Sequence, residues 1–200
     1  MTESGFQQLK EVILLKLHDG LDPRLIYHSL GHTKDVLQQA ERIAKSENIS
    51  DARVLLLIKI ASLFHDAGFL YTYQGHEEKS CEIMLQSLDS KLFEKNELTM
   101  IQGMIMATKI PQSPSTLPEK IICDADLDYL GRDDFEVISN CLKQEFLTYN
   151  IIGSEHEWDQ LQVRFIENHL YFTDTSIKER YPGKLIHLEK LKQKLVDQSP

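Results

Sequence analysis

The chain has 200 residues, of which 42% are hydrophobic and 26% are charged, and its formal net charge is −9 at pH 7. The length suits one globular domain that can bury a sizeable core without disulfides or a structural metal. The acidic balance argues against a surface for long nucleic acid, which needs a basic patch.

The first helix is predicted by the helical spacing of apolar residues over 9–17, after a flexible start. Gly20 and Asp22-Pro23 then break the chain. Proline is favoured in the first turn of a helix, so Pro23 can open the next one.

Two further helices precede the middle of the chain. An apolar stripe predicts a helix over 32–44. Ser50 is a suitable N-cap for a strongly apolar helix that runs to about 64–67, and Gly68 is expected to end it. This run is too short for a membrane span and contains Lys59, so we expect a buried helix and no membrane partner.

The rest of the chain also has helical spacing, after a loop at 71–75. Prolines at 111 and 114 require another loop over 110–117. No alternation of apolar and polar residues is long enough to indicate a sheet. We therefore predict an all-α fold, a single compact bundle of about eight helices over 1–200. The predicted later helices are 76–88, 97–108, 118–130, 133–148, 155–170 and 176–196, the last an amphipathic helix that covers the core.

Cellular context is indicated by the cysteines and the N-terminus. Cys81, Cys123 and Cys141 have no CxxC or zinc-finger spacing, so we expect reduced thiols. The N-terminal segment lacks the basic and apolar regions of a signal peptide. Both features favour a cytoplasmic protein.

Adjacent polar residues, His65 and Asp66, end the most apolar predicted helix. Charged residues are rarely buried unless they are paired or bind a metal. The alternative is that both simply cap a helix end, and for an isolated His-Asp pair that alternative is the more usual one. The pair becomes informative only with partners elsewhere in the chain.

Two other segments supply such partners. His28 and His32 are four residues apart, which puts them on one face of a helix at a spacing typical of metal ligands. Surface histidines have the same spacing. Asp124, Asp126 and Asp128 alternate in an apolar setting, where Asp126 is the best placed to face inward. The alternative for this triplet is a solvated acidic face.

Taken in order, these segments give a His, a His-Asp pair and a distant Asp on three predicted helices. The set resembles the HD superfamily of metal-dependent phosphohydrolases, with His32, His65-Asp66 and Asp126 in its motif positions. The resemblance covers about 21–172. Further stretches similar to a poorly characterised bacterial subgroup are FHDAGF, GHEEKS, MATKIPQSP and CDADLDYLGRDDF.

The resemblance implies an HD-domain bundle whose core, about 21–172, binds a divalent metal ion through His32, His65, Asp66 and Asp126. Two imidazoles and two carboxylates suit Mn, Fe, Zn, Ni, Co or Mg. One ion is expected, and a second could bind. Such an ion polarises a phosphate and lowers the pKa of a bound water, so Asp66 is also expected to be catalytic.

Neighbouring residues could complete the site. In the related cyclic-nucleotide phosphodiesterases a histidine at the offset of His28 protonates the leaving oxygen, which makes His28 a candidate general acid; alternatively it only orients His32. His76 and Glu77 could bind substrate or a second metal, or simply begin a helix. Lys109 could bind phosphate, or face a helix C-terminus. Arg132 is a similar phosphate-binding candidate.

The predicted function is hydrolysis of a phosphate ester or anhydride by a metal-activated water. The resemblance points to a nucleotide or cyclic nucleotide as the small phosphorylated partner, and a homodimer is left open. The alternative is a catalytically silent nucleotide-binding or regulatory module with the same fold. A purely structural zinc site is disfavoured, because such sites usually use Cys and His ligands.

Overall fold

The computed structural model describes residues 1–197, which contain helices and no strand. The all-α prediction is confirmed, with more helices than the eight or so expected. The α-helices are α1 (Glu3–Gly20), α2 (Leu30–Ser46), α3 (Ala52–Phe64), α4 (His76–Ser87), α5 (Lys95–Ala107), α6 (Leu117–Asp126), α7 (Phe135–Thr148), α8 (Glu155–Asn168), α9 (Asp174–Glu179) and α10 (Tyr181–Asp197). The 3-10 turns are η1 (Ala67–Leu70), η2 (Ser90–Leu92) and η3 (Asp128–Gly131).

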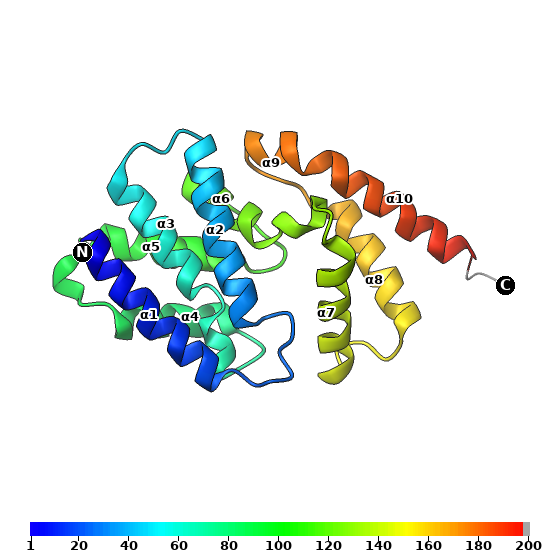
Figure 1. Ribbon diagram of the computed structural model, residues 1–200, viewed down its shortest axis with the longest axis horizontal. Coiled ribbons are helices and arrows are strands. Elements are labelled where there is room, and N and C mark those ends of the chain that lie inside the picture. Colours follow the sequence, from blue (N-terminus) through cyan, green and yellow to red (C-terminus); the bar gives the residue numbers. More distant parts are fainter. Residues whose placement is uncertain (198–200) are drawn as a thin grey trace.

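The helices form two hydrophobic clusters, which we call the N-terminal cluster and the C-terminal cluster. The N-terminal cluster takes its buried side chains from α1 to α6, and α3 lies at its centre, in contact with α2 and α5. The C-terminal cluster combines side chains of η3, α7, α8 and α10 with Tyr27. Figure 1 shows the two clusters at opposite ends of the long axis, with α2 and α6 on the side of the N-terminal cluster that faces the C-terminal cluster.

The loop between α1 and α2 differs from the prediction, because Pro23 does not open a helix. Asp22 closes a turn by accepting hydrogen bonds from the backbone N–H and the guanidinium of Arg24. Helix α2 begins only at Leu30, after Ser29 at its N-cap. His28 therefore lies in the loop, and His28 and His32 do not share a helical face.

Both ends of α3 also differ from the prediction. Asp51, not Ser50, caps the helix, and its carboxylate accepts from the N–H groups of Arg53 and Val54. The helix ends at Phe64, before Gly68. A Cβ on Gly68 would lie 2.0 Å from the carbonyl oxygen of His76, so this glycine permits a close approach of η1 to the start of α4.

Two long helices predicted from the sequence are each broken in the structure. The segment 118–130 forms α6 followed by η3, and 176–196 is divided at Arg180 into α9 and α10. A Cβ on Gly131 would lie 2.1 Å from the carbonyl oxygen of Arg180, so η3 touches the α9–α10 junction backbone to backbone. Helix α10 packs on α8 and η3. None of the helices within 1–197 is both long and apolar enough to cross a membrane.

Candidate metal centre

Four side chains from α2, the end of α3 and α6 converge on one point. The Nε2 atom of His32 lies 3.1 Å from Oδ1 of Asp126 and 3.4 Å from Oδ2 of Asp66. The Nε2 atom of His65 lies 3.3 Å from Nε2 of His32 and 3.2 Å from Oδ2 of Asp66. The structure thus brings together all four residues that the sequence proposed as metal ligands.

The orientation of His65 is fixed by the helix that ends beside it. Its Nδ1–H group donates to the carbonyl oxygen of Ser62 at 2.9 Å, which leaves Nε2 facing the carboxylates. Burial lowers the pKa of His65, but the neighbouring Asp66 and Asp126 outweigh burial and raise it to about 9. A divalent ion at this point would replace that proton, because a metal-bound imidazole is neutral.

The residues fit a metal ion by their chemistry and by one unsatisfied atom. Donor atoms of His32, His65 and Asp66 all lie within 4.8 Å of one another. The Oδ2 atom of Asp66 is buried and accepts no hydrogen bond from the described residues. Burial disfavours the charge on Asp66, yet His65 and His76 hold the pKa of this carboxyl well below its usual range. Only the imidazoles of His32 and His65 lie beside this buried, ionised oxygen, and a divalent cation among these groups would satisfy it.

His28 lies beside this centre, held by a carboxylate from α7 that sequence reasoning missed. The Nδ1 atom of His28 is 2.5 Å from Oε1 of Glu145, and Oε2 of Glu145 accepts the backbone N–H groups of Tyr27 and His28 at 2.9 and 3.1 Å. The hydroxyl of Tyr73 donates to the same carboxylate. Glu145 is fully buried, and its contacts with His28 outweigh burial and lower its pKa.

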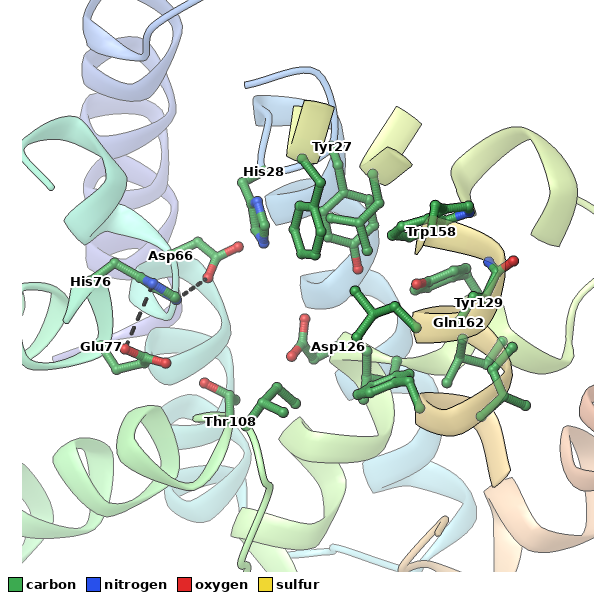
Figure 2. A pocket seen from close by; sticks show the side chains of 18 residues that line it. Tyr27, His28, Asp66, His76, Glu77, Thr108, Asp126, Tyr129, Trp158 and Gln162 are labelled. Atoms are coloured by element: carbon green, nitrogen blue, oxygen red, sulfur yellow. Dashed lines mark ion pairs between the residues drawn. The ribbon is translucent and has the colours of Figure 1, made fainter. Parts of the chain in front are cut away.

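His76 and Glu77 reach the centre from the first turn of α4. The Nε2 atom of His76 lies 3.5 Å from Oδ1 of Asp66, and its Nδ1 lies 3.6 Å from Oε2 of Glu77 (Figure 2). The ring of Phe69 stacks between His28 and His76, with centroid distances of 4.2 and 4.0 Å. The close approach at Gly68 thus positions α4 against the metal centre.

The two cationic candidates lie elsewhere. The amine of Lys109 pairs with Glu78 at an exposed position. The guanidinium of Arg132 is engaged by the carboxylates of Asp35 and Asp134, both at 2.8 Å, and by Asp128 at 3.5 Å. Neither side chain lines the pocket described below, so the geometry does not support phosphate binding by these two residues.

Of the three alternating aspartates, only Asp126 faces the metal centre. Asp124 is fully buried and accepts hydrogen bonds from the backbone N–H groups of Phe172 and Thr173. Asp128 is fully buried and pairs with arginines of α2 and the α9–α10 junction. The alternative of a solvated acidic face is therefore wrong.

Comparison with known proteins agrees with this architecture. The sequence matches no family model and no curated protein. Among solved structures, the chain is similar to a predicted HD superfamily hydrolase from an uncultured Thermotogales bacterium, with a TM-score of 0.61. The alignment covers 96% of this chain and 92% of that one at 21% sequence identity. The chain has an HD-type fold.

In this HD-type fold the metal centre opens into a pocket of about 300 Å³. Asp66, Asp126, His76, Glu77 and His28 form its polar end. Figure 2 shows Trp158, Tyr129 and Gln162 on the side opposite to His76 and Glu77. The pocket thus lies between the N-terminal cluster, which carries the metal centre, and α8 of the C-terminal cluster.

Proposed function

We propose that this protein is a metal-dependent phosphohydrolase that hydrolyses a phosphate ester or anhydride, with a nucleotide or cyclic nucleotide as the expected substrate class. The observation that carries the proposal is the convergence of two imidazoles and two carboxylates at the inner end of a ligand-sized pocket. The HD-type fold supports it, because the solved neighbour is itself described as a predicted hydrolase.

His32, His65, Asp66 and Asp126 would hold one divalent ion of Mn, Fe, Zn, Ni, Co or Mg. When bound, such an ion polarises the phosphoryl group and makes water acidic enough to attack phosphorus at neutral pH. The two carboxylates balance the charge of the ion. His76 and Glu77, on the other side of Asp66, could contact a second ion or the phosphate.

His28 has the geometry of a general acid in this proposal. Glu145 holds Nδ1 of the ring, so Nε2 is free to deliver a proton to the leaving oxygen. The same buried carboxylate fixes the backbone of Tyr27 and His28, because it accepts both of their N–H groups.

The test begins with metal analysis of the purified protein, followed by a screen of nucleotides and other phosphoesters with several divalent ions. We expect bound metal and metal-dependent release of phosphate or of a nucleoside monophosphate. Bound metal and bound nucleotide without turnover on the whole panel would contradict the proposal. That result would favour the silent binding module.

A further inference from the structure

Beyond the metal centre, the pocket continues into a part that we call the apolar chamber. Its wall is formed by Leu127, Leu130, Leu142, Phe146, Leu161 and Phe165, with Trp158 beside them. These side chains come from η3, the residue before it, α7 and α8, so the chamber is formed by the same elements that contribute to the C-terminal cluster. Most of a substrate bound here would contact carbon atoms.

Few polar groups in the chamber are free to recognise a substrate. The amide of Gln162 donates to the hydroxyl of Ser139, outside the chamber. The side chains of Tyr27 and Tyr129 are buried and pack against each other, with a distance of 5.7 Å between ring centroids. A ligand with many hydrogen-bonding groups would lose its bonds to water here without replacing them.

The charge of the lining limits the number of phosphates. The pocket residues, all within the described part of the chain, include no lysine or arginine, whereas Asp66, Glu77 and Asp126 are acidic. The nearby cations Lys109 and Arg132 already pair with carboxylates. A polyphosphate chain would therefore have no lysine or arginine to contact, and only the imidazoles of His28 and His76 and the proposed metal could balance its charge.

The size of the pocket sets a further limit. A volume of about 300 Å³ is at the small end of ligand-binding pockets. It suits a single phosphoryl group joined to one ring or a short aliphatic chain, and it is small for a dinucleotide.

We propose that the substrate is a phosphoester with a single phosphoryl group on an apolar aliphatic or aromatic alcohol. This inference rests on the proposed phosphohydrolase activity and replaces the nucleotide expected there with a phosphoester of an apolar alcohol. Hydrolysis breaks the bond between phosphorus and the ester oxygen and forms one to the water oxygen. The alcohol leaves with a proton, inorganic phosphate is the other product, and no further reactant is needed. The alcohol occupies the apolar chamber.

Binding can be measured without turnover, because Trp158 is the only tryptophan of the chain and lines the pocket. Methyl-, butyl- and hexylphosphonate carry a non-hydrolysable head group and do not absorb where tryptophan does. We expect the Mn-loaded protein to bind them with an affinity that rises about fourfold per methylene. Equal affinity for methyl- and hexylphosphonate would overturn the inference.

A matched pair of variants on α7 tests whether the apolar chamber causes the dependence of phosphonate affinity on chain length. Leu142→Asn places an amide in the chamber, whereas Val137→Asn changes an exposed residue of the same helix. We expect L142N to lose most of the chain-length dependence and V137N to keep it, with methylphosphonate bound equally by both. Leu161→Asn on α8 repeats the test if L142N does not fold. Chain-length dependence that survives both chamber variants would overturn the inference.

Turnover separates this inference from the proposed function. With Mn, we expect hexyl and phenyl phosphate to be hydrolysed with a higher kcat/KM than methyl phosphate, AMP or ATP. Preferred turnover of ATP would overturn the apolar substrate class while the phosphohydrolase activity stands. If no phosphoester is hydrolysed but phosphonate binding still depends on chain length, the proposed phosphohydrolase activity is contradicted. The preference of the chamber for apolar groups on the ligand would then still stand.

Discussion

Asp124, Asp126 and Asp128 are spaced two residues apart, yet each meets a different kind of partner. Asp124 accepts backbone N–H groups, Asp128 pairs with arginines, and Asp126 faces two imidazoles. At Asp124 burial raises the pKa to about 6, against the hydrogen bonds from Thr173. The same residue type thus fixes a loop at Asp124, faces the candidate metal centre at Asp126 and pairs with arginines at Asp128.

Replacement of either metal-facing aspartate tests the centre itself. We expect Asp66→Ala and Asp126→Ala to lose bound metal and turnover together, because each removes one of two carboxylates that balance the ion. Metal content by elemental analysis and phosphoester hydrolysis measure the two effects. Asp35→Ala is the control, since Asp35 pairs with Arg132 outside the pocket. An aspartate variant with full metal and full turnover would remove that residue from the ligand set.

The role of His28 can be separated from metal binding. We expect His28→Gln to lower kcat by about 10²- to 10⁴-fold with metal content unchanged, as for loss of a general acid. Glu145→Gln should lower kcat less, by about 10- to 100-fold, because it removes the carboxylate that orients the ring of His28. Loss of metal from His28→Gln would instead make His28 a ligand.

Residue by residue, the sequence predicted the contents of the centre better than its surroundings. The family resemblance implied His32, His65, Asp66 and Asp126 as metal ligands, and the structure places these four side chains together. Glu145 was not predicted, because only the tertiary fold brings α7 to residue 28, 117 positions away. Lys109 and Arg132, proposed to bind phosphate, lie outside the pocket lining and pair with carboxylates. A cation near the motif is not free to bind phosphate when carboxylates already surround it.

Among the elements, the predicted helices were found, but several boundaries were wrong for physical reasons. A 3-10 turn nearly preserves the apolar spacing of a helix, so η3 reads as a continuation of α6. The sequence predicted one helix in place of α9 and α10, because the apolar residues keep their helical spacing across Arg180. Gly68 was expected to end α3. In the structure its lack of a side chain instead allows the backbone at the start of α4 to approach closely.

The contact between α3 and α5 gives a prediction with a defined pH dependence. Two guanidinium nitrogens of Arg53 lie 2.5 and 2.6 Å from the carboxylate of Glu97. Hydrogen bonds from Arg53 lower the pKa of Glu97 to about 2 from its ordinary 4.5. The ion pair therefore contributes stability that is fully present above pH 4.5 and is lost as pH falls towards 2.

We expect Glu97→Gln to lower the free energy of unfolding by about 1 kcal/mol at pH 7, with a smaller loss at pH 3. Glutamine can keep the hydrogen bond to the backbone N–H of Glu94, so the change isolates the ion pair. Urea unfolding at several pH values measures it, and Arg53→Met completes a double-mutant cycle. An equal loss at both pH values would mean that the ion pair is not the cause.

For the whole molecule, the pocket lies where the two hydrophobic clusters meet. The helices of the N-terminal cluster supply the candidate metal ligands, and η3, α7 and α8 supply the apolar chamber. Tyr27, which precedes α2, packs into the C-terminal cluster. Asp128 links Arg42 of α2 to Arg180 beside α10, at 2.7 and 2.9 Å. Because these contacts are buried or half-buried, separation of the clusters would expose polar groups as well as apolar surface.

The single-domain prediction can therefore be tested by whether the two clusters unfold together. Trp158 belongs to α8, so its fluorescence reports on the C-terminal side of the pocket, whereas circular dichroism reports on all helices. We expect one transition with the same midpoint by both probes. Added metal should raise that midpoint in both signals, because the ion binds only the folded state. Two separate midpoints would show that the clusters are independent domains.

Asp128→Ala gives a second test of whether the two clusters unfold together. It leaves Arg42, Arg132 and Arg180 around an empty buried position, which typically costs about 3 to 5 kcal/mol. If the clusters are one cooperative unit, both signals shift to lower temperature together and metal still binds, since Asp128 does not line the pocket. If only the fluorescence transition moved, Asp128 would stabilise the C-terminal cluster alone, and the chamber could open without unfolding the metal centre.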